Sequence, residues 1–129
     1  MGIHEHVNGV WDRDILGPLV EYVAIPNVSS AYDAQWAEAG HMERAVSLVH
    51  DWCAARRIAG MVIDVQRLPG RTPLIVIDIP AFGGADPDRT VILYGHLDKQ
   101  PEMTGWREGL GPWTPVVEGE RLYGRGGAD

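Results

Sequence analysis

The sequence predicts an α/β fold in which helices pack on a mixed sheet. Apolar residues recur at helical spacing over much of residues 10–57, and runs typical of β-strands follow between residues 61 and 94. The last of these runs, residues 90–94, leads directly into Gly-His-Leu-Asp, and open α/β sheets bind ligands at the carboxyl ends of their strands. A chain of 129 residues, 45% of them hydrophobic, is long enough for one domain with its own core.

Two helices are expected in the first half of the chain. The first covers residues 10–23 and contains Gly17-Pro18, so either the helix kinks there or its regular part begins with Pro18 in the first turn. The second covers residues 34–57, with Asp33 as the N-cap. Its buried stripe follows i, i+3, i+4, i+7 spacing and comprises Met42, Ala45, Val46, Val49, Trp52 and Cys53.

The strands are expected in the second half. Residues 61–68 alternate between apolar and polar, which predicts a half-buried strand, and residues 74–79 supply its antiparallel partner. Residues 90–94 are apolar on both faces and predict the buried central strand of the sheet. A further hairpin is expected within residues 115–123, turning at Glu-Gly-Glu.

The end of the central strand carries the chemistry. Residues at i and i+2 of a strand point to the same side, so the Asp98 carboxylate can reach the imidazole of His96. A carboxylate in that place fixes the tautomer of the ring and presents its other nitrogen to a metal. Taken alone, the pair is equally consistent with a structural hydrogen bond that closes the end of the strand and binds no metal.

Asp129 is the second candidate metal ligand. It follows a glycine-rich loop, residues 123–128, and its carboxylate is a hard oxygen donor. The loop lacks the Gly-Lys-Ser/Thr ending of a phosphate-binding P-loop.

Composition excludes several classes of function. The net charge of −7 provides no basic surface for nucleic acid or for an anionic membrane. The single cysteine, Cys53, excludes an internal disulfide and fits a reducing compartment. No stretch is long and apolar enough to span a bilayer. We therefore expect a cytoplasmic protein with neither a nucleic-acid nor a membrane partner.

Four segments together resemble a known family. They are Tyr-Gly-His-Leu-Asp-Lys-Gln-Pro at 94–101, Gly-Trp at 105–106, Gly-Pro-Trp-Thr-Pro at 111–115 and Leu-Tyr-Gly-Arg-Gly-Gly-Ala-Asp at 122–129. They are similar to the N-terminal part of the carnosinase and aminoacylase family of dinuclear zinc peptidases. The dipeptidase branch is the most similar, and the family also contains glutamate carboxypeptidases and succinyl-diaminopimelate desuccinylase. Tyr-Val-Ala-Ile-Pro-Asn-Val-Ser at 22–29 extends the resemblance to almost the whole chain.

The resemblance implies a role for each matched residue. His96 matches the first zinc ligand, Asp98 the carboxylate that orients it, and Asp129 the aspartate that bridges the two metal ions. The implied reaction is hydrolysis of dipeptides or N-acyl amino acids by a metal-activated water, with two zinc ions, or manganese or cobalt in their place. Lys99 stands where the family more often has an apolar residue, on the side of the strand away from His96.

The remaining machinery of the family does not occur in this sequence. A glutamate pair, another acidic ligand, a distal histidine and the domain used for homodimer formation would all lie further on. We therefore expect residues 1–129 to be the truncated N-terminal portion of a metallopeptidase catalytic domain. Such a fragment would be inactive, and it would self-associate or bind its complementary fragment.

Two alternatives stay open at the level of sequence. The chain could be a non-enzymatic α/β module that binds a partner chain, and the intact mass of the natural gene product would separate this from the hydrolase. Trp106 and Trp113 could either line the cleft or fix the loop that contains them.

Overall fold

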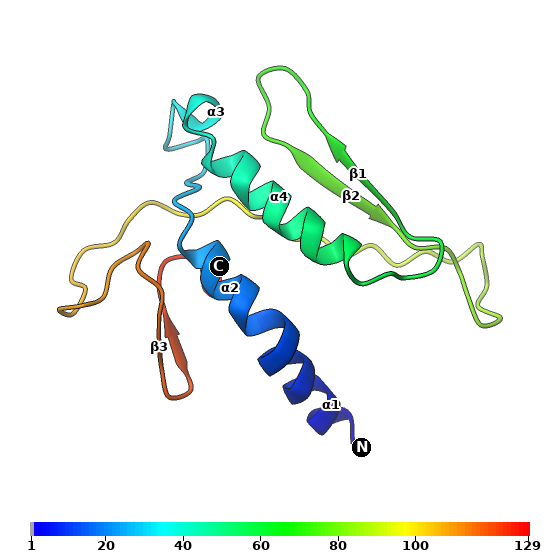
Figure 1. Ribbon diagram of the computed structural model, residues 1–129. Helices are drawn as coiled ribbons and strands as arrows, with labels where there is room; N and C mark the ends of the chain where they lie inside the picture. The colour runs from blue at the N-terminus through cyan, green and yellow to red at the C-terminus, as the bar shows by residue number, and fades with distance from the viewer. Residues whose placement is uncertain (1) are drawn as a thin grey trace.

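The computed structural model describes residues 2–129 and consists of helices and two small antiparallel sheets (Figure 1). The elements are, in chain order, α1 (Ile3–Val10), η1 (Trp11–Ile15), α2 (Leu16–Val23), α3 (Trp36–Ala39), α4 (His41–Ala54), β1 (Val62–Gln66), β2 (Leu74–Asp78), β3 (Val116–Glu118) and β4 (Arg121–Tyr123). The α/β class is confirmed. The single mixed sheet is not, because within the described residues β1 pairs with β2 alone and β3 with β4 alone. No helix in residues 2–129 combines the length and apolar character needed to cross a membrane.

The N-terminal helix begins earlier than the sequence predicts. Helical backbone runs through α1, η1 and α2, from Ile3 to Val23. The regular part does not begin at Pro18, which is the third residue of α2; the irregularity expected near Gly17-Pro18 is instead the π turn of η1, directly before α2. Beyond α2, Pro26 prevents the helix from continuing, because the residue before a proline is sterically disfavoured in the α conformation.

The turn before α2 is a π-helix, and Pro18 lies in the first turn that follows it. A proline has no N–H for the carbonyl four residues earlier, here that of Asp14, and its ring crowds that carbonyl. Proline at position 18 therefore leaves the Asp14 carbonyl, at the end of η1, without the N–H that a regular helix would supply. The indole N–H of Trp52 donates to the Asp14 carbonyl at 2.7 Å, and so ties the end of α4 to this turn.

The second predicted helix, residues 34–57, is two helices in the structure. Gly40 adopts a φ of +73°, the left-handed region, and separates α3 from α4. Asp33 acts near the expected place, because its carboxylate accepts the Gln35 N–H at 2.9 Å just before α3. The helical spacing of residues 42–53 is confirmed in α4, whereas the predicted bounds are too wide, because α3 begins at Trp36 and α4 ends at Ala54. The break at Gly40 is not indicated by that spacing.

The core is small and lies where α2 meets α4. The buried apolar side chains are Val23, Ile25, Met42, Ala45 and Val46. Three of them confirm the predicted stripe of α4, whereas Trp52 and Cys53 at its end are half-buried. Burial raises the pKa of the Cys53 thiol, which keeps it protonated near neutral pH.

Strands β1 and β2 form the predicted antiparallel hairpin. Ile63 lies opposite Ile77 and Val65 opposite Ile75, and burial alternates along β1 as the sequence predicts. One contact with α4 is an ion pair in which the Arg67 guanidinium donates to both carboxylate oxygens of Glu43, at 2.7 and 3.0 Å. This pair lies at the surface, so it orients the hairpin more than it stabilises the fold.

Residues 90–94 do not form the buried central strand that the sequence predicts. They lie outside every strand, and the side chains of residues 91–94 are 86–92% exposed. A strand requires hydrogen-bonded neighbours at its edges, and the described part of the chain supplies none for this segment. The apolar residues of this segment therefore remain exposed, because no described strand pairs with it.

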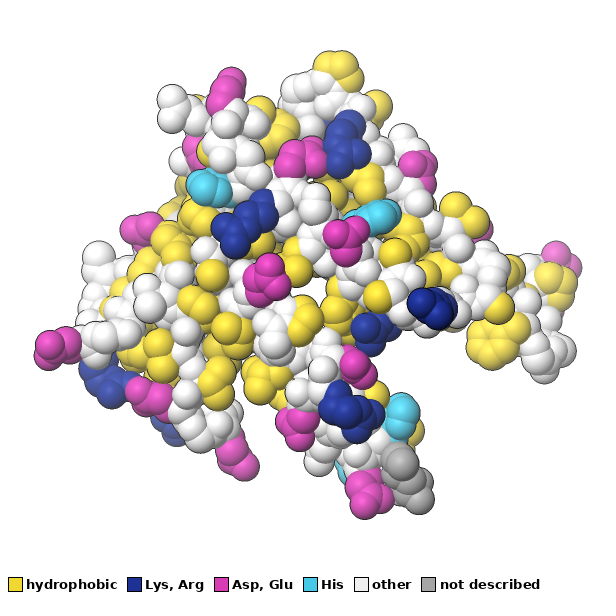
Figure 2. Space-filling view, in the orientation of Figure 1, with side chains coloured by type: hydrophobic (Ala, Val, Ile, Leu, Met, Phe, Trp, Pro, Cys, Tyr) yellow, Lys and Arg dark blue, Asp and Glu magenta, His cyan; other side chains and the backbone are white. Residues whose placement is uncertain are grey.

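The accessible surface is correspondingly large. A compact monomer of 14.2 kDa exposes about 6,800 Å², whereas this chain exposes 9624 Å². Figure 2 shows hydrophobic side chains spread over the visible face of the molecule, including on the loop that follows β2. Much of the apolar surface that a finished core would cover is therefore open to solvent.

The last hairpin, β3 with β4, is confirmed where the sequence predicts it. Val116 lies opposite Tyr123, and the turn contains Gly119 at a φ of +59°. After β4 the chain turns back, and its C-terminus lies beside α2 (Figure 1). This return brings the glycine-rich loop to the end of α2, where residues 96–99 also lie.

Candidate functional site

The segment that carries His96 and Asp98 is fixed against the chain that leaves α2. The Lys99 N–H donates to the Asn27 carbonyl at 3.0 Å, and the Ser29 N–H donates to the Lys99 carbonyl at 2.8 Å. These two hydrogen bonds form a short parallel bridge between Val28 and Lys99. The sequence predicts that the site lies at the end of a sheet strand. The structure instead attaches it to residues 27–29, the segment that follows α2.

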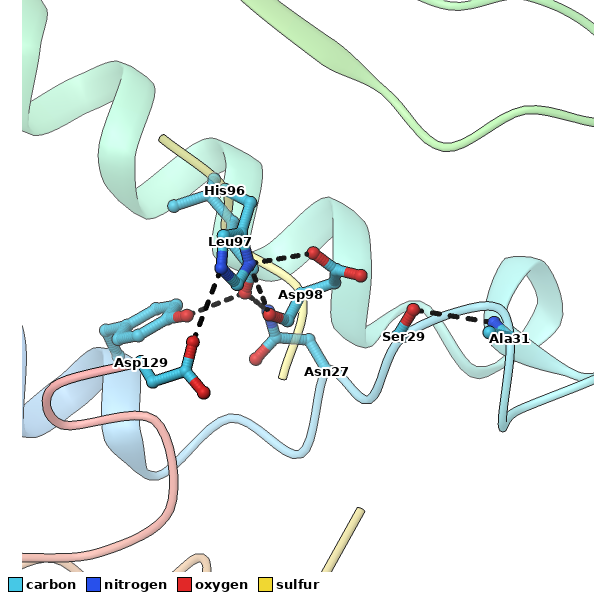
Figure 3. A network of polar contacts seen from close by, with 8 residues as sticks. Asn27, Ser29, Ala31, His96, Leu97, Asp98 and Asp129 are labelled. Atoms are coloured by element: carbon cyan, nitrogen blue, oxygen red, sulfur yellow. Dashed lines mark hydrogen bonds and ion pairs between the residues drawn. The ribbon is translucent and has the colours of Figure 1, made fainter. Parts of the chain in front are cut away.

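His96 and Asp98 interact as their spacing predicts. The Nδ1 atom of His96 lies 3.0 Å from Oδ1 of Asp98 and 2.9 Å from the Asp98 backbone carbonyl (Figure 3). Both partners are acceptors, so Nδ1 carries the proton and donates. Hydrogen bonding to that carbonyl first, and to the carboxylate next, raises the pKa of His96 above its ordinary value. The hydrogen bond is confirmed, while the metal-orienting role of Asp98 stays a prediction.

Asp129 lies at the other side of the same imidazole. Its Oδ1 atom is 3.5 Å from Nε2 of His96, and Figure 3 shows the ring between the two carboxylates. The predicted co-location of His96 and Asp129 is therefore confirmed, although 33 residues separate them in the sequence. All three side chains are at least one-third exposed.

The donor set fits part of a zinc site. With the proton on Nδ1, the Nε2 lone pair of His96 faces the Asp129 carboxylate, and imidazole nitrogen with carboxylate oxygen is a common zinc ligand pair. Within residues 2–129, however, no group of three His, Cys, Asp or Glu side chains converges to hold a metal ion. Two ligands are present, and a complete site needs at least one more.

Two side-chain donors, the half-buried Tyr22 and the buried Asn27, fix the peptide between the histidine and the carboxylate. The Tyr22 hydroxyl and the Asn27 side-chain amide each donate to the Leu97 carbonyl at 2.6 Å. Burial raises the pKa of Tyr22 to about 12, so its hydroxyl remains a donor. The oxygen of the same Asn27 amide is buried and has no hydrogen-bond partner within the described chain. Both donors lie in the 22–29 segment of the family resemblance, but no spacing rule indicates these contacts, which join residues at least 70 positions apart.

A cavity of about 520 Å³ opens beside the site. Its walls come from α2, η1, α4 and the two site segments, and they comprise Ile15, Pro18, Leu19, Tyr22, Leu48, Val49, Trp52, His96, Leu97, Gly126, Gly127, Ala128 and Asp129. The walls are mostly apolar, and the polar groups of the site lie at one side. This arrangement is typical of a ligand-binding cleft, and equally of a gap that further chain would fill.

The two tryptophans of the long loop do not line this cavity. The Trp106 indole donates to the Met103 carbonyl at 2.7 Å, and the Trp113 indole donates to the Glu102 carboxylate at 2.5 Å. Of the two arrangements expected for these residues, the structure therefore places both within the loop that contains them.

Replacing Asp98 by Asn should lower the pKa of His96. The amide cannot stabilise the imidazolium as a carboxylate does, while the backbone carbonyl bond remains. Because folding raises the pKa of His96, the stabilisation by Asp98 is complete below the unfolded-state pKa and is lost as pH rises through the folded-state pKa. An NMR titration of His96, with urea unfolding at pH 5.5 and 8.5, measures both effects. Asp51→Asn, which alters the similar His50 contact, is the control and should leave His96 unchanged.

No family model matches the chain.

Proposed function

We propose that this chain carries part of the metal centre of a zinc-dependent hydrolase that cleaves dipeptides or N-acyl amino acids. The observation that supports the proposal most directly is the position of His96 between two carboxylates, with Asp98 on Nδ1 and Asp129 beside Nε2. The half-buried Tyr22 and the buried Asn27 hold the intervening peptide in place, as expected where ligand geometry matters. The resemblance of the surrounding motifs to dinuclear zinc peptidases gives the class of reaction.

Each residue has a distinct task in this proposal. His96 would donate Nε2 to one metal ion, and the Asp129 carboxylate would be shared between two and so reduce their mutual repulsion. Asp98 would keep the proton on Nδ1 and make the imidazole a stronger ligand. The metal ions, when bound, supply Lewis-acid activation of the amide carbonyl and of a water molecule.

The rest of the centre must come from outside the described residues. The lining of the cavity within residues 2–129 includes no glutamate that could move a proton. Further ligands and the general base would be supplied by additional polypeptide, either continuous with this chain or in a second chain. The homodimer and the cytoplasmic location implied by the family belong to the same proposal.

Zinc binding tests the ligand pair directly. We expect Zn²⁺ to bind weakly by calorimetry, because two protein ligands hold it less tightly than four. His96→Ala and Asp129→Ala should each abolish the binding. The matched control is His50→Ala, which removes another surface histidine whose Nδ1 lies 2.9 Å from an aspartate, Asp51. Equal loss in the control, or unaltered binding in both site variants, would contradict the proposed ligands.

Hydrolysis tests the reaction class. The natural gene product, with its intact mass established, should cleave dipeptides or N-acyl amino acids when supplied with Zn²⁺, Mn²⁺ or Co²⁺, and His96→Ala should abolish turnover. The 129-residue polypeptide alone should show no turnover under the same conditions. Turnover by that polypeptide would contradict the argument that its site is incomplete.

The exposed segment of residues 91–94 favours a second candidate, a non-enzymatic α/β module that binds a partner chain. Apolar side chains on an unpaired extended backbone are suited to strand addition by another polypeptide. A natural gene product of 129 residues that forms a stable complex and shows no metal-dependent turnover would support this candidate against the hydrolase.

A further inference from the structure

Lys99 occupies an unusual place for a lysine. It is 1% exposed, and its ammonium lies at the C-terminal end of α2. Nζ donates to the carbonyls of Tyr22 at 2.7 Å, Val23 at 3.3 Å and Ile25 at 2.6 Å. The Tyr22 and Val23 carbonyls belong to the last turn of α2, where carbonyls carry partial negative charge, and the Ile25 carbonyl follows the helix. One ammonium therefore donates to three acceptors and complements the helix dipole.

Two aromatic rings complete the surroundings of the ammonium. Nζ lies 4.0 Å from the centre of the Tyr22 ring and 5.3 Å from that of Trp113. Both distances are within the range of cation–π attraction. Burial lowers the pKa of Lys99 to about 8, so the group is still mostly an ammonium near neutral pH and donates to these carbonyls. A neutral apolar residue would leave the carbonyls without this donor.

The aliphatic stem of Lys99 supports the loop that leads to Asp129. Gly126 lies so close that a Cβ there would stand 2.7 Å from both Cδ and Cε of the lysine. The neighbouring Arg125 holds the loop from the other side, through its N–H to the Pro112 carbonyl at 2.7 Å and its Nε to the Pro101 carbonyl at 3.1 Å. The path of this loop, and with it the start of the segment that ends at Asp129, is therefore set against the lysine stem.

We propose that Lys99 is the positioning residue of the site, joining the α2 exit, the His96–Asp98 segment and the loop before Asp129 into one geometry. Its backbone forms hydrogen bonds with Asn27 and Ser29, and its ammonium donates to carbonyls at the end of α2. Its aliphatic stem packs against Gly126. The proposal rests on the proposed function for the role of His96 as a metal ligand. The position and tautomer of His96 can nevertheless be measured without metal.

The test compares Lys99→Met with Arg56→Met in the metal-free protein. Arg56 is a matched cation, because it also donates to a carbonyl near a helix end, that of Trp52 at 3.2 Å, and lies over that residue's ring at 4.3 Å. The readout is the ¹⁵N spectrum of His96 near neutral pH, below the pKa of Lys99, where the shifts of the neutral imidazole fraction report its tautomer in folded molecules. We expect Lys99→Met to lose the Nδ1–H tautomer and Arg56→Met to keep it. Retention of that tautomer in Lys99→Met would overturn the proposal.

A second pair of variants separates the charge of Lys99 from its bulk. In a Cys53→Ala background, Lys99→Cys is alkylated in denaturant either with bromoethylamine or with iodopropane, and then refolded. The two products have side chains of equal length, one ending in an ammonium and the other in a methyl group. Only the aminoethyl product should restore the His96 tautomer. Restoration by the propyl product would overturn the charged role of Lys99.

Zinc affinity distinguishes this proposal from the proposed function. If the wild type binds Zn²⁺, Lys99→Met should weaken the binding by about tenfold to a hundredfold, the usual effect of altering groups that orient a ligand. If the wild type binds no Zn²⁺ while Lys99→Met still loses the tautomer, the positioning role stands and the hydrolase proposal fails. Unchanged zinc affinity together with an unchanged tautomer would overturn the positioning role.

Discussion

Alanine at Gly126 should destabilise the fold far more than alanine at Gly105. Both glycines have a φ of +84°, so a Cβ costs each about 1–2 kcal/mol of backbone strain. At Gly105 nothing lies within 4 Å of the added atom, whereas at Gly126 it meets the Lys99 stem at 2.7 Å. Crowding a packed position typically adds about 1–3 kcal/mol. We therefore expect a loss of about 2–5 kcal/mol for Gly126→Ala and about 1–2 kcal/mol for Gly105→Ala.

Urea unfolding of the two variants checks this difference, because the strain is common to both and only the contact differs. Gly126→Ala should also weaken zinc binding, since the loop it displaces leads to Asp129, and Gly105→Ala should not. Equal losses of stability would show that the lysine stem yields to the new atom and that the loop is not held against it.

The local elements of the fold were predictable from the sequence because their signals are local. Helical spacing identified the N-terminal helix and α4, and alternation with turn residues identified both hairpins. The π turn and the break at Gly40 were missed. The π turn lies beside a contact with Trp52, 38 residues away from Asp14, which no local pattern indicates. The break at Gly40 uses a left-handed conformation that glycine permits and does not require.

Residues 90–94 show why a strand is harder to predict than a helix. A helix satisfies its own backbone, whereas a strand exists only beside a neighbour. The apolar pattern of residues 90–94 is typical of a strand that is paired at its edges and covered on both faces. The described part of the chain supplies neither a paired strand nor a covering layer for it.

The same distinction applies to the candidate site. The contact of His96 with Asp98 follows from two residues at i and i+2, and it was predicted correctly. The approach of Asp129 was predicted from the motif that it ends. The groups that hold the site, Tyr22 and Asn27, interact with it across 70 or more residues, and no spacing rule reaches that far. In the sequence Lys99 stands out only as a departure from an apolar position, and the three carbonyl acceptors at the end of α2 accommodate its ammonium there.

Association through residues 91–94 is the second large effect that we expect. These four apolar side chains are almost fully exposed on a backbone without strand partners, a combination that favours edge-to-edge pairing. The wild-type polypeptide should therefore show a mass by light scattering that rises with concentration. Val91→Lys combined with Leu93→Lys places two charges on one face of the segment and should oppose this pairing. Burial of two such side chains contributes about 3–6 kcal/mol, so association should require at least about a hundredfold more protein.

The control is Ile3→Lys combined with Val7→Lys, which makes the same kind of change on one exposed face of α1. The backbone groups of a helix are already paired, so an exposed apolar stripe there offers side chains but no strand edge. If the unpaired backbone of residues 91–94 directs association, the segment variant becomes monomeric and the α1 variant still associates. If both variants become monomeric, general hydrophobic surface is responsible. A wild-type polypeptide that remains monomeric at high concentration would show that the exposed segment does not bind a copy of itself, and an added partner chain would then be the remaining way to pair it.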